Sequence, residues 1–131
     1  MKIAVDTNVL VRAVVRDDEE QARAAVKTLE EAETIVVSLP CLCEFVWVLR
    51  KVYHFCPHDI SAAIRALAAI KKVVMDRQAV DVGLAIFKGG GDFADGVIAY
   101  SGESSGADIF VSFDKKAVSL LLEHGRFARL I

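Results

Sequence analysis

The sequence is poor in the residues that mark disulfide-linked, disordered and membrane-spanning proteins. Among its 131 residues are only two prolines and three cysteines, and three cysteines cannot all pair within one chain. Its longest stretch without a charged residue or histidine runs from Thr34 to Cys43, about half of the ~20 residues that a bilayer-spanning helix needs. We therefore expect a folded protein without membrane spans, in the reducing cytoplasm.

An excess of basic residues is also missing. The formal net charge is −2, so we expect no long-range attraction of the kind that basic nucleic-acid binders use. The first acid, Asp6, comes too early for a signal peptide. A polyanionic ligand would have to be held by local groups.

Apolar residues, by contrast, are abundant. Hydrophobic types make up 54 % of the chain, against about 45–50 % in ordinary soluble domains. The length is typical of one domain, and no repeat or linker divides it. We predict a single domain over residues 1–131, with part of its apolar surface covered by a partner.

Short apolar runs alternate with helical patterns along the chain. The runs are typical of buried strands and cover residues 2–5, 34–38 and 108–112, with weaker ones at 73–75 and 126–131. Apolar residues at helical spacing predict helices over 18–32, after Pro40, over 60–68 and from about residue 94. Strands alternating with helices indicate an α/β fold with a parallel sheet.

Two acids directly follow predicted strands. Asp6 ends the first run, and Asp114 follows the run that ends at Phe113. Ligands of open parallel sheets bind beyond the carboxyl ends of the strands, so both acids are placed for chemistry. An acid after a strand is also a common N-cap of the next helix, and this alternative stays open for both residues.

Glu44 lies on a helix with little polar surface. Apolar residues occupy one face, and Trp47 and Val48 lie on the opposite one, so we expect the glutamate to be partly buried. Buried acids are rare unless they are paired with a cation or bound to a metal. The alternatives are a surface ion pair with Arg50 or Lys51, or simple exposure.

A glycine triplet leads into the fourth group of acids. Gly89-Gly90-Gly91 is followed by Asp92 and Asp95 at i, i+3 spacing, which allows both to point the same way from a first helical turn. Asp92 is equally well explained as an N-cap. Asp95, inside the turn, has less structural reason to be acidic.

These acids come from four separate elements and can meet at one end of the sheet. Carboxylates a few ångströms apart raise one another's pKa, and a divalent ion reverses this effect. Oxygen ligands without nitrogen or sulfur suit Mg²⁺ or Mn²⁺. A metal that activates water and neutralises charge on phosphorus implies phosphate esters as substrates.

In this order and at these separations, the residues resemble the PIN-domain family, and the length resembles its VapC-like toxin branch. The resemblance spans nearly the whole chain. It is carried by Asp6-Thr7-Asn8 after the first strand, Glu44 followed by Phe45-Val46-Trp47-Val48-Leu49, Asp92 to Ala99, and Val111-Ser112-Phe113-Asp114.

The resemblance implies a three-layer α/β/α sandwich around a parallel sheet of about five strands. It implies a ribonuclease that hydrolyses RNA with Mg²⁺ or Mn²⁺, with a catalytic quartet of Asp6, Glu44, Asp95 and Asp114. The metal ligands would be Asp6, Asp95, Asp114 and Asp92, and the supporting polar residues Thr7, Asn8 and Ser112. It also implies a toxin that dimerises and is inhibited by a cognate antitoxin protein.

Two other functions fit parts of the pattern. A haloacid-dehalogenase-like phosphatase also starts with a strand that ends in aspartate, and Gly91-Asp92-Phe93-Ala94-Asp95 is similar to its later metal motif. That chemistry needs a second aspartate where this chain has Asn8, and an amide cannot protonate the leaving group. A non-catalytic module that binds RNA or a partner is the other alternative. Retention of every acid argues against it.

Overall fold

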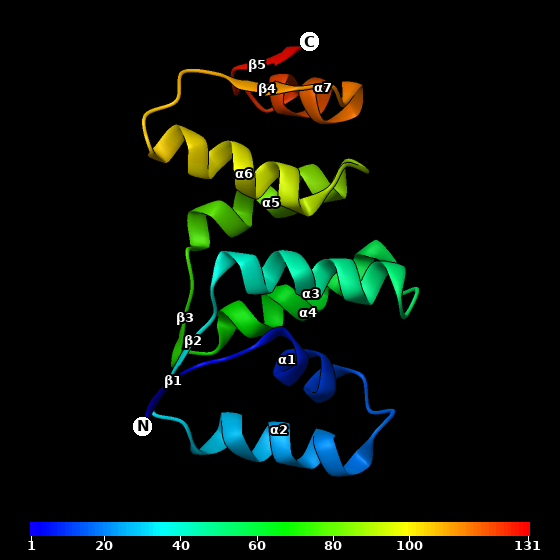
Figure 1. Cartoon of the computed structure of the whole chain (residues 1–131), viewed down its shortest axis with the longest axis vertical. Helices are drawn as coiled ribbons and strands as arrows, with labels where there is room; N and C mark the ends of the chain where they lie inside the picture. Colours follow the sequence, from blue (N-terminus) through cyan, green and yellow to red (C-terminus); the bar gives the residue numbers. More distant parts are fainter. The chain divides into compact units, whose positions relative to one another are not determined.

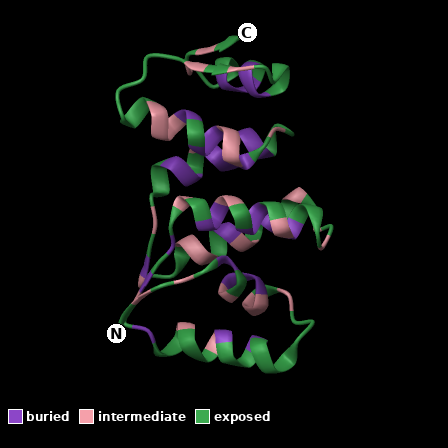
Figure 2. Ribbon diagram, viewed as in Figure 1, coloured by how far each residue is buried: buried purple, intermediate pink, exposed green.

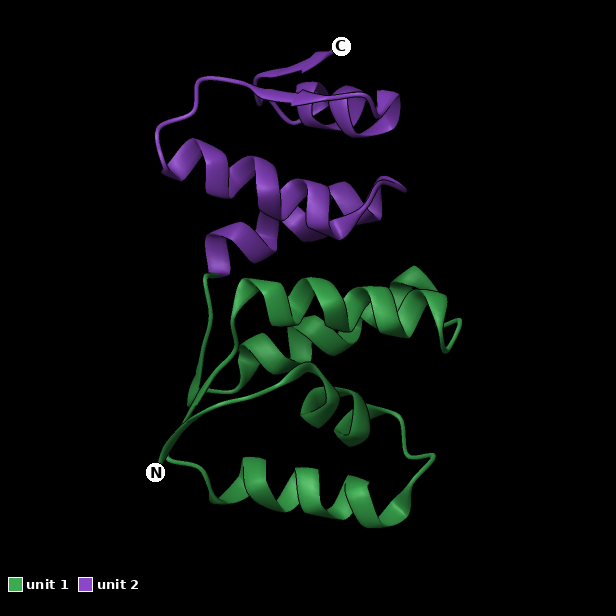
Figure 3. Cartoon of the chain, in the orientation of Figure 1, with its two compact units in different colours: residues 1–76 green, residues 77–131 purple.

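The structure, a computed structural model, describes all residues from Met1 to Ile131. The chain forms two compact units, residues 1–76 and residues 77–131 (Figure 3). Each unit has its own helices and its own parallel sheet. The single domain predicted over residues 1–131 stays a prediction.

The first unit holds a three-stranded parallel sheet in the order β1-β2-β3 (Figure 1). Its strands are β1 (Lys2–Ala4), β2 (Thr34–Val36) and β3 (Val73–Val74). Ile35 of β2 lies opposite Ile3 on one side and Val73 on the other. The helices of this unit are α1 (Thr7–Val14), α2 (Glu19–Glu31), α3 (Leu39–Lys51) and α4 (Pro57–Ala69).

The second unit holds two parallel strands and three helices. The strands are β4 (Phe110–Ser112) and β5 (Ala128–Leu130), with Val111 opposite Arg129. The helices are α5 (Arg77–Lys88), α6 (Phe93–Ser104) and α7 (Lys115–Glu123). Every strand pair in the chain is therefore parallel, and the α/β class predicted from the sequence is confirmed. The five strands are divided between two sheets.

The core of the first unit is formed by α3, α4 and the central strand. Leu42, Phe45 and Leu49 of α3 are buried, as their helical spacing predicts, together with Ile35 and Ile60 (Figure 2). α3 begins where the Ser38 hydroxyl accepts a hydrogen bond from the Cys41 N–H at 3.2 Å. Pro40 lies in the first turn, where a missing N–H costs no helical hydrogen bond.

In the second unit, α5 and α6 pack at very short range. Phe93 and Ile86 are buried there, and Ile86 also contacts Leu120 and Leu121 of α7 in one apolar cluster. Phe110 of β4 and Ala128 of β5 pack against that cluster. The sheet of this unit thus lies on α7 and α6, and the ends of α6 and α7 are held in place by the core.

Three helices were not predicted from apolar spacing, namely α1, α5 and α7. The sequence of α1 contains Val9, Leu10 and Val11, a β-branched run that continues the pattern of the preceding strand. Its helical state is set by the cap at Asp6, a local polar contact that apolar periodicity does not register. None of the seven helices is long and apolar enough to cross a membrane.

Candidate active site

Asp6 caps α1 at the carboxyl end of β1. Its Oδ1 accepts a hydrogen bond from the Asn8 N–H at 3.1 Å, and its side chain is exposed. The N-cap alternative is therefore correct, but the cap engages only one of the two carboxylate oxygens. One oxygen satisfies the helix, and Oδ2 makes no hydrogen bond within the protein. Asp6 can cap α1 and still present an oxygen to a cation.

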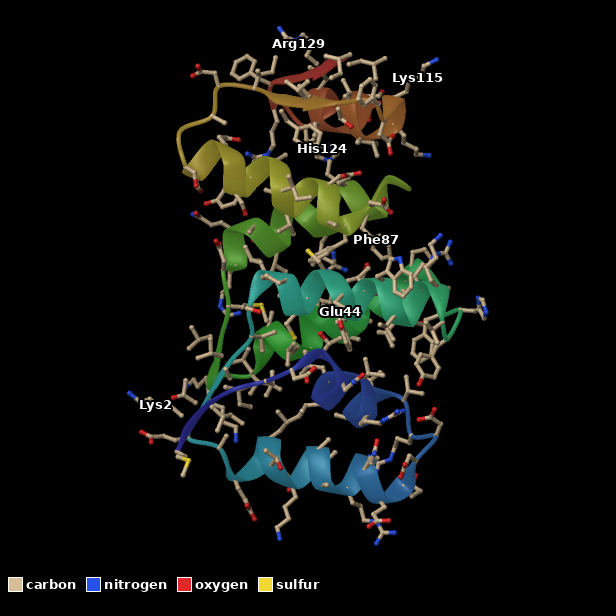
Figure 4. All side chains as sticks on the ribbon, viewed as in Figure 1. Lys2, Glu44, Phe87, Lys115, His124 and Arg129 are labelled. Carbon is tan, nitrogen blue, oxygen red and sulfur yellow. The ribbon has the colours of Figure 1, made fainter.

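Glu44 lies in the middle of α3 (Figure 4). Its side chain is exposed, so our expectation of partial burial is wrong. Leu42, Phe45 and Leu49 turn toward the core while position 44 faces outward, because a 3.6-residue period leaves one stripe of even an apolar helix facing outward. The surface ion pair is not found either, since Arg50 donates to the Phe55 carbonyl at 3.4 Å and no basic side chain pairs with Glu44.

Cys41 connects these two acids within the first unit. Burial raises the pKa of its thiol, a hydrogen bond with the Thr7 side chain lowers it, and the charges of Asp6 and Glu44 raise it further. The charges of both acids therefore act on the same buried thiol, although Asp6 and Glu44 are far apart in the sequence.

Thr7 is one of only two buried polar residues of the chain, at 5 % exposure. Its contact with Cys41 links α1 to α3 directly behind Asp6. We expected Thr7 to orient a metal, water or phosphate, whereas its buried contact fits the positioning of Asp6. Asn8 is exposed, with its amide free to reach a ligand.

Asp114 occupies in the second unit the place that Asp6 occupies in the first. It caps α7 just after β4, and its Oδ1 accepts from the N–H groups of Lys116 at 2.9 Å and Ala117 at 3.1 Å. Ser112 Oγ accepts from the Asp114 N–H at 2.9 Å. This contact fixes the backbone at Asp114 and leaves the hydroxyl proton of Ser112 for another acceptor. As with Asp6, the second carboxylate oxygen makes no hydrogen bond.

Asp92 and Asp95 flank the start of α6. Asp92 holds the N-cap position but makes no capping hydrogen bond with its side chain, so both its oxygens are available. Asp95 is partly buried in the first turn. Burial raises the pKa of Asp95, and the charges of Asp92 and Asp114 raise it further. The second unit thus gathers three acids at the starts of two helices.

The glycine triplet before Asp92 ends α5. The N–H groups of Gly90 and Gly91 donate to the carbonyls of Phe87 and Ile86 at 3.0 Å each, and Gly90 has a φ of 94°. This is the pattern of a Schellman helix end, which needs a left-handed residue. The glycine triplet has no free N–H group for a phosphate. Its role is to end α5 and to connect it to Asp92 at the start of α6.

The donor set of these acids fits a hard divalent cation. The oxygens are carboxylates, and the mutual repulsion seen at Asp95 is of the kind that a bound cation removes. In the first unit the charges of Asp6 and Glu44 both act on Cys41, and in the second the charges of Asp92 and Asp114 act on Asp95. Neither unit by itself holds three acidic, histidine or cysteine side chains close enough to enclose an ion.

Sequence reasoning missed one residue of this arrangement. Cys41 was not among the predicted site residues, yet the charges of both Asp6 and Glu44 act on its thiol. No signal in the sequence shows that its thiol meets Thr7, because the two residues belong to different helices. Their contact depends on how α1 packs on α3.

The comparison with known protein families agrees with this geometry. Residues 3–120 match the PIN domain family, a range that contains all the acids described above. A comparison with curated proteins gave no match. Because the family match covers most of the chain, the protein belongs to the PIN domain family, whose members are generally nucleases that use divalent metal ions.

Proposed function

We propose that the protein is a ribonuclease that hydrolyses RNA phosphodiester bonds with Mg²⁺ or Mn²⁺. Its catalytic residues would be Asp6, Glu44, Asp95 and Asp114, and its metal ligands Asp6, Asp95, Asp114 and Asp92. The observation that carries the proposal is the placement of Asp92, Asp95 and Asp114 at the starts of α6 and α7, in a chain that matches the PIN domain family. These carboxylates repel one another. In a member of a nuclease family, such repulsion indicates that a cation is their partner.

The metal, when bound, would lower the pKa of an attacking water and neutralise charge on the phosphate. The residues of the chain would do the rest. Asp6 and Asp114 are held rigidly because each caps a helix with one oxygen. Glu44, exposed and without an ion pair, is suited to accept a proton from the water. Asn8 and Ser112 each offer a polar group to the phosphate, and Thr7 positions Asp6.

The resemblance carries further parts of the proposal. We propose that the nuclease is the cytoplasmic toxin of a toxin–antitoxin pair, that it forms a homodimer and that a cognate antitoxin inhibits it. Large apolar side chains that are more than half exposed support a protein partner, namely Trp47, Phe113 and Phe127. The three-layer sandwich with about five strands in one sheet stays a prediction.

The family membership favours a nuclease over the phosphatase alternative, which also lacks its leaving-group acid because position 8 is Asn8. A non-catalytic RNA-binding module keeps the same fold and differs only in activity. Cleavage assays separate it from an enzyme.

The test is cleavage of a labelled single-stranded RNA by the purified full chain, with Mg²⁺, with Mn²⁺ and with EDTA. We expect cleavage with either metal and none with EDTA. Asp6→Asn, Glu44→Gln, Asp95→Asn and Asp114→Asn should each lower the rate by at least about 100-fold, as removal of a catalytic group does. Asn is as good an N-cap as Asp, so lost activity in the Asp6 and Asp114 variants would not reflect a lost helix.

Asp81→Asn is the matched control, because Asp81 is exposed on α5 and has no place in the proposed site. It should cleave like the wild type. Metal should also raise the melting temperature of the wild type but not of Asp95→Asn. Cleavage that persists in EDTA, or that survives all four substitutions, would contradict the proposal.

A further inference from the structure

We propose that Lys115 and Lys116 bind a backbone phosphate of the RNA beside the acids of the second unit. The inference rests on the proposed ribonuclease function, which supplies the polyanionic ligand. It adds the means by which a chain of net charge −2 holds that ligand next to its own carboxylates.

The two lysines border a hollow on the surface of the second unit. The hollow has a volume of about 550 Å³ and is lined by Gly89, Lys115, Lys116, Ser119, Leu120 and Glu123. Lys115 extends outward from the first turn of α7 (Figure 4). Neither lysine forms an ion pair, so both ammonium groups are available to an anion.

The glycine triplet makes room for α7 to lie against it. A Cβ atom on Gly90 would come within 3.0 Å of Lys116 Nζ and 3.2 Å of its Cε, and a Cβ atom on Gly89 would come within 2.6 Å of a Leu120 methyl group. Lys116 and Leu120 are one helical turn apart and both rest on the loop. The exposed side chain of Lys116 therefore ends over Gly90, at the edge of the hollow.

The lysines are the only cationic groups of the hollow, and Ser119 adds a hydroxyl that can donate to a phosphate. The N–H groups of Gly89, Gly90 and Gly91 all donate to carbonyls at the end of α5. At the start of α7, the N–H groups of Lys116 and Ala117 are taken by Asp114. These five backbone N–H groups are therefore not available for the kind of capture seen in phosphate-binding loops, and the positive charge of the hollow comes from the two side-chain ammonium groups.

The position of the lysines relates them to the proposed chemistry. Lys115 directly follows Asp114, and Asp114 is close enough to Asp95 to raise its pKa. The cations and the acids therefore share the start of α7. Three carboxylates repel RNA, and two ammonium groups in the next turn offset this repulsion. Lysine acts as a point charge without base recognition, so the site would hold RNA of any sequence.

The test measures RNA binding without cleavage. The full chain is titrated into a fluorescein-labelled single-stranded RNA in EDTA at low salt, and the anisotropy gives the Kd. The main variant, Lys115→Met with Lys116→Met, keeps both apolar stems and removes both charges. We expect its Kd to rise about tenfold, and the slope of log Kd against log salt to fall by ~0.7, the value for one lost phosphate contact with a single strand.

Two further variants make the result specific to this place. Lys51→Met removes one positive charge from α3, half of the change in the double variant, at a position where Lys51 is exposed and unpaired, and it should bind like the wild type. Glu123→Gln removes the one acid of the hollow and should tighten binding. Melting temperatures of all variants check that they are folded.

The inference is overturned if the double variant binds RNA as the wild type or the Lys51→Met variant does, including the case in which none of them binds. Cleavage assays with Mn²⁺ separate this failure from failure of the proposed function. We expect the double variant to raise KM by about tenfold with kcat changed little, because lost phosphate binding is a loss of uniform binding. A wild type that binds RNA through the lysines but never cleaves it would overturn the ribonuclease proposal and leave the phosphate site standing.

Discussion

The backbone of Gly96 in α6 lies directly against the backbone of Gly83 in α5. A Cβ atom at position 96 would come within 2.8 Å of both the Gly83 Cα and the Val82 carbonyl oxygen. Both contacts are with main-chain atoms, which cannot move aside as the end of a side chain can. The close approach of these helices also places Asp95, the residue before Gly96, at the start of α6.

Gly96→Ala should therefore force α5 and α6 apart. We expect a loss of about 1–3 kcal/mol in the free energy of unfolding, the usual cost of overpacking a tight contact. The measurement is urea denaturation followed by circular dichroism. If the proposed function holds, cleavage should fall as well, because Asp95 moves with the helix.

Gly102→Ala is the control in the same helix. A Cβ atom there meets only Ala107 Cβ at 3.8 Å, an ordinary contact, so the substitution should be neutral or stabilise by up to about 1 kcal/mol through a less flexible unfolded chain. Equal stability of the Gly96 and Gly102 variants would show that the close helix contact is wrong.

Asp95→Asn should stabilise the protein in the absence of metal. The folded protein raises the pKa of Asp95 above its ordinary value of 3.8 through burial and through the charges of Asp92 and Asp114. The charged form is thus disfavoured in the folded state. We expect a gain of no more than about 1 kcal/mol at neutral pH, since solvent screens a partly exposed group.

The pH dependence of this gain follows from linkage. Above the raised pKa, Asp95 is charged in both states and destabilises the fold, so the Asn variant is the more stable. As the pH falls below 3.8, the carboxyl group is protonated in both states and the difference vanishes. Urea denaturation at neutral pH and at about pH 3 measures both ends. A gain that persists in acid would have to come from something other than this charge.

Lys72 should stabilise the first unit by capping α2. Its ammonium group donates to the carbonyl oxygens of Leu29 at 2.7 Å, Glu30 at 2.9 Å and Ala32 at 3.0 Å. A cation on the last carbonyls of a helix satisfies acceptors without partners and interacts favourably with the helix dipole. Lys72→Met should lower the free energy of unfolding by about 1–2 kcal/mol.

Lys71→Met tests whether the loss in the free energy of unfolding comes from the hydrogen bonds of Lys72 or from the removal of a positive charge. Lys71 is the exposed neighbour and forms no ion pair. Its removal changes the net charge equally and should cost little. Similar losses for the two variants would mean that the three hydrogen bonds of Lys72 contribute nothing measurable.

The local patterns of the sequence were enough to predict the parallel α/β class and the helices α2, α3, α4 and α6. Strand runs such as 34–38 and the apolar stripe of α3 depend on residue spacing alone, and this spacing can be read directly from the sequence. The caps at Asp6 and Asp114 were also open to prediction, because a cap uses residues two or three positions apart.

The tertiary structure alone decided which acids meet and which are buried. The charges of Asp6 and Glu44 both act on the Cys41 thiol because α1 packs on α3, and the charge of Asp114 acts on Asp95 because α6 and α7 share a core. Glu44 is exposed where a local reading of its helix predicted burial. Burial and charge coupling depend on side chains that are distant in sequence, and their energies fall off with distance in space rather than along the chain.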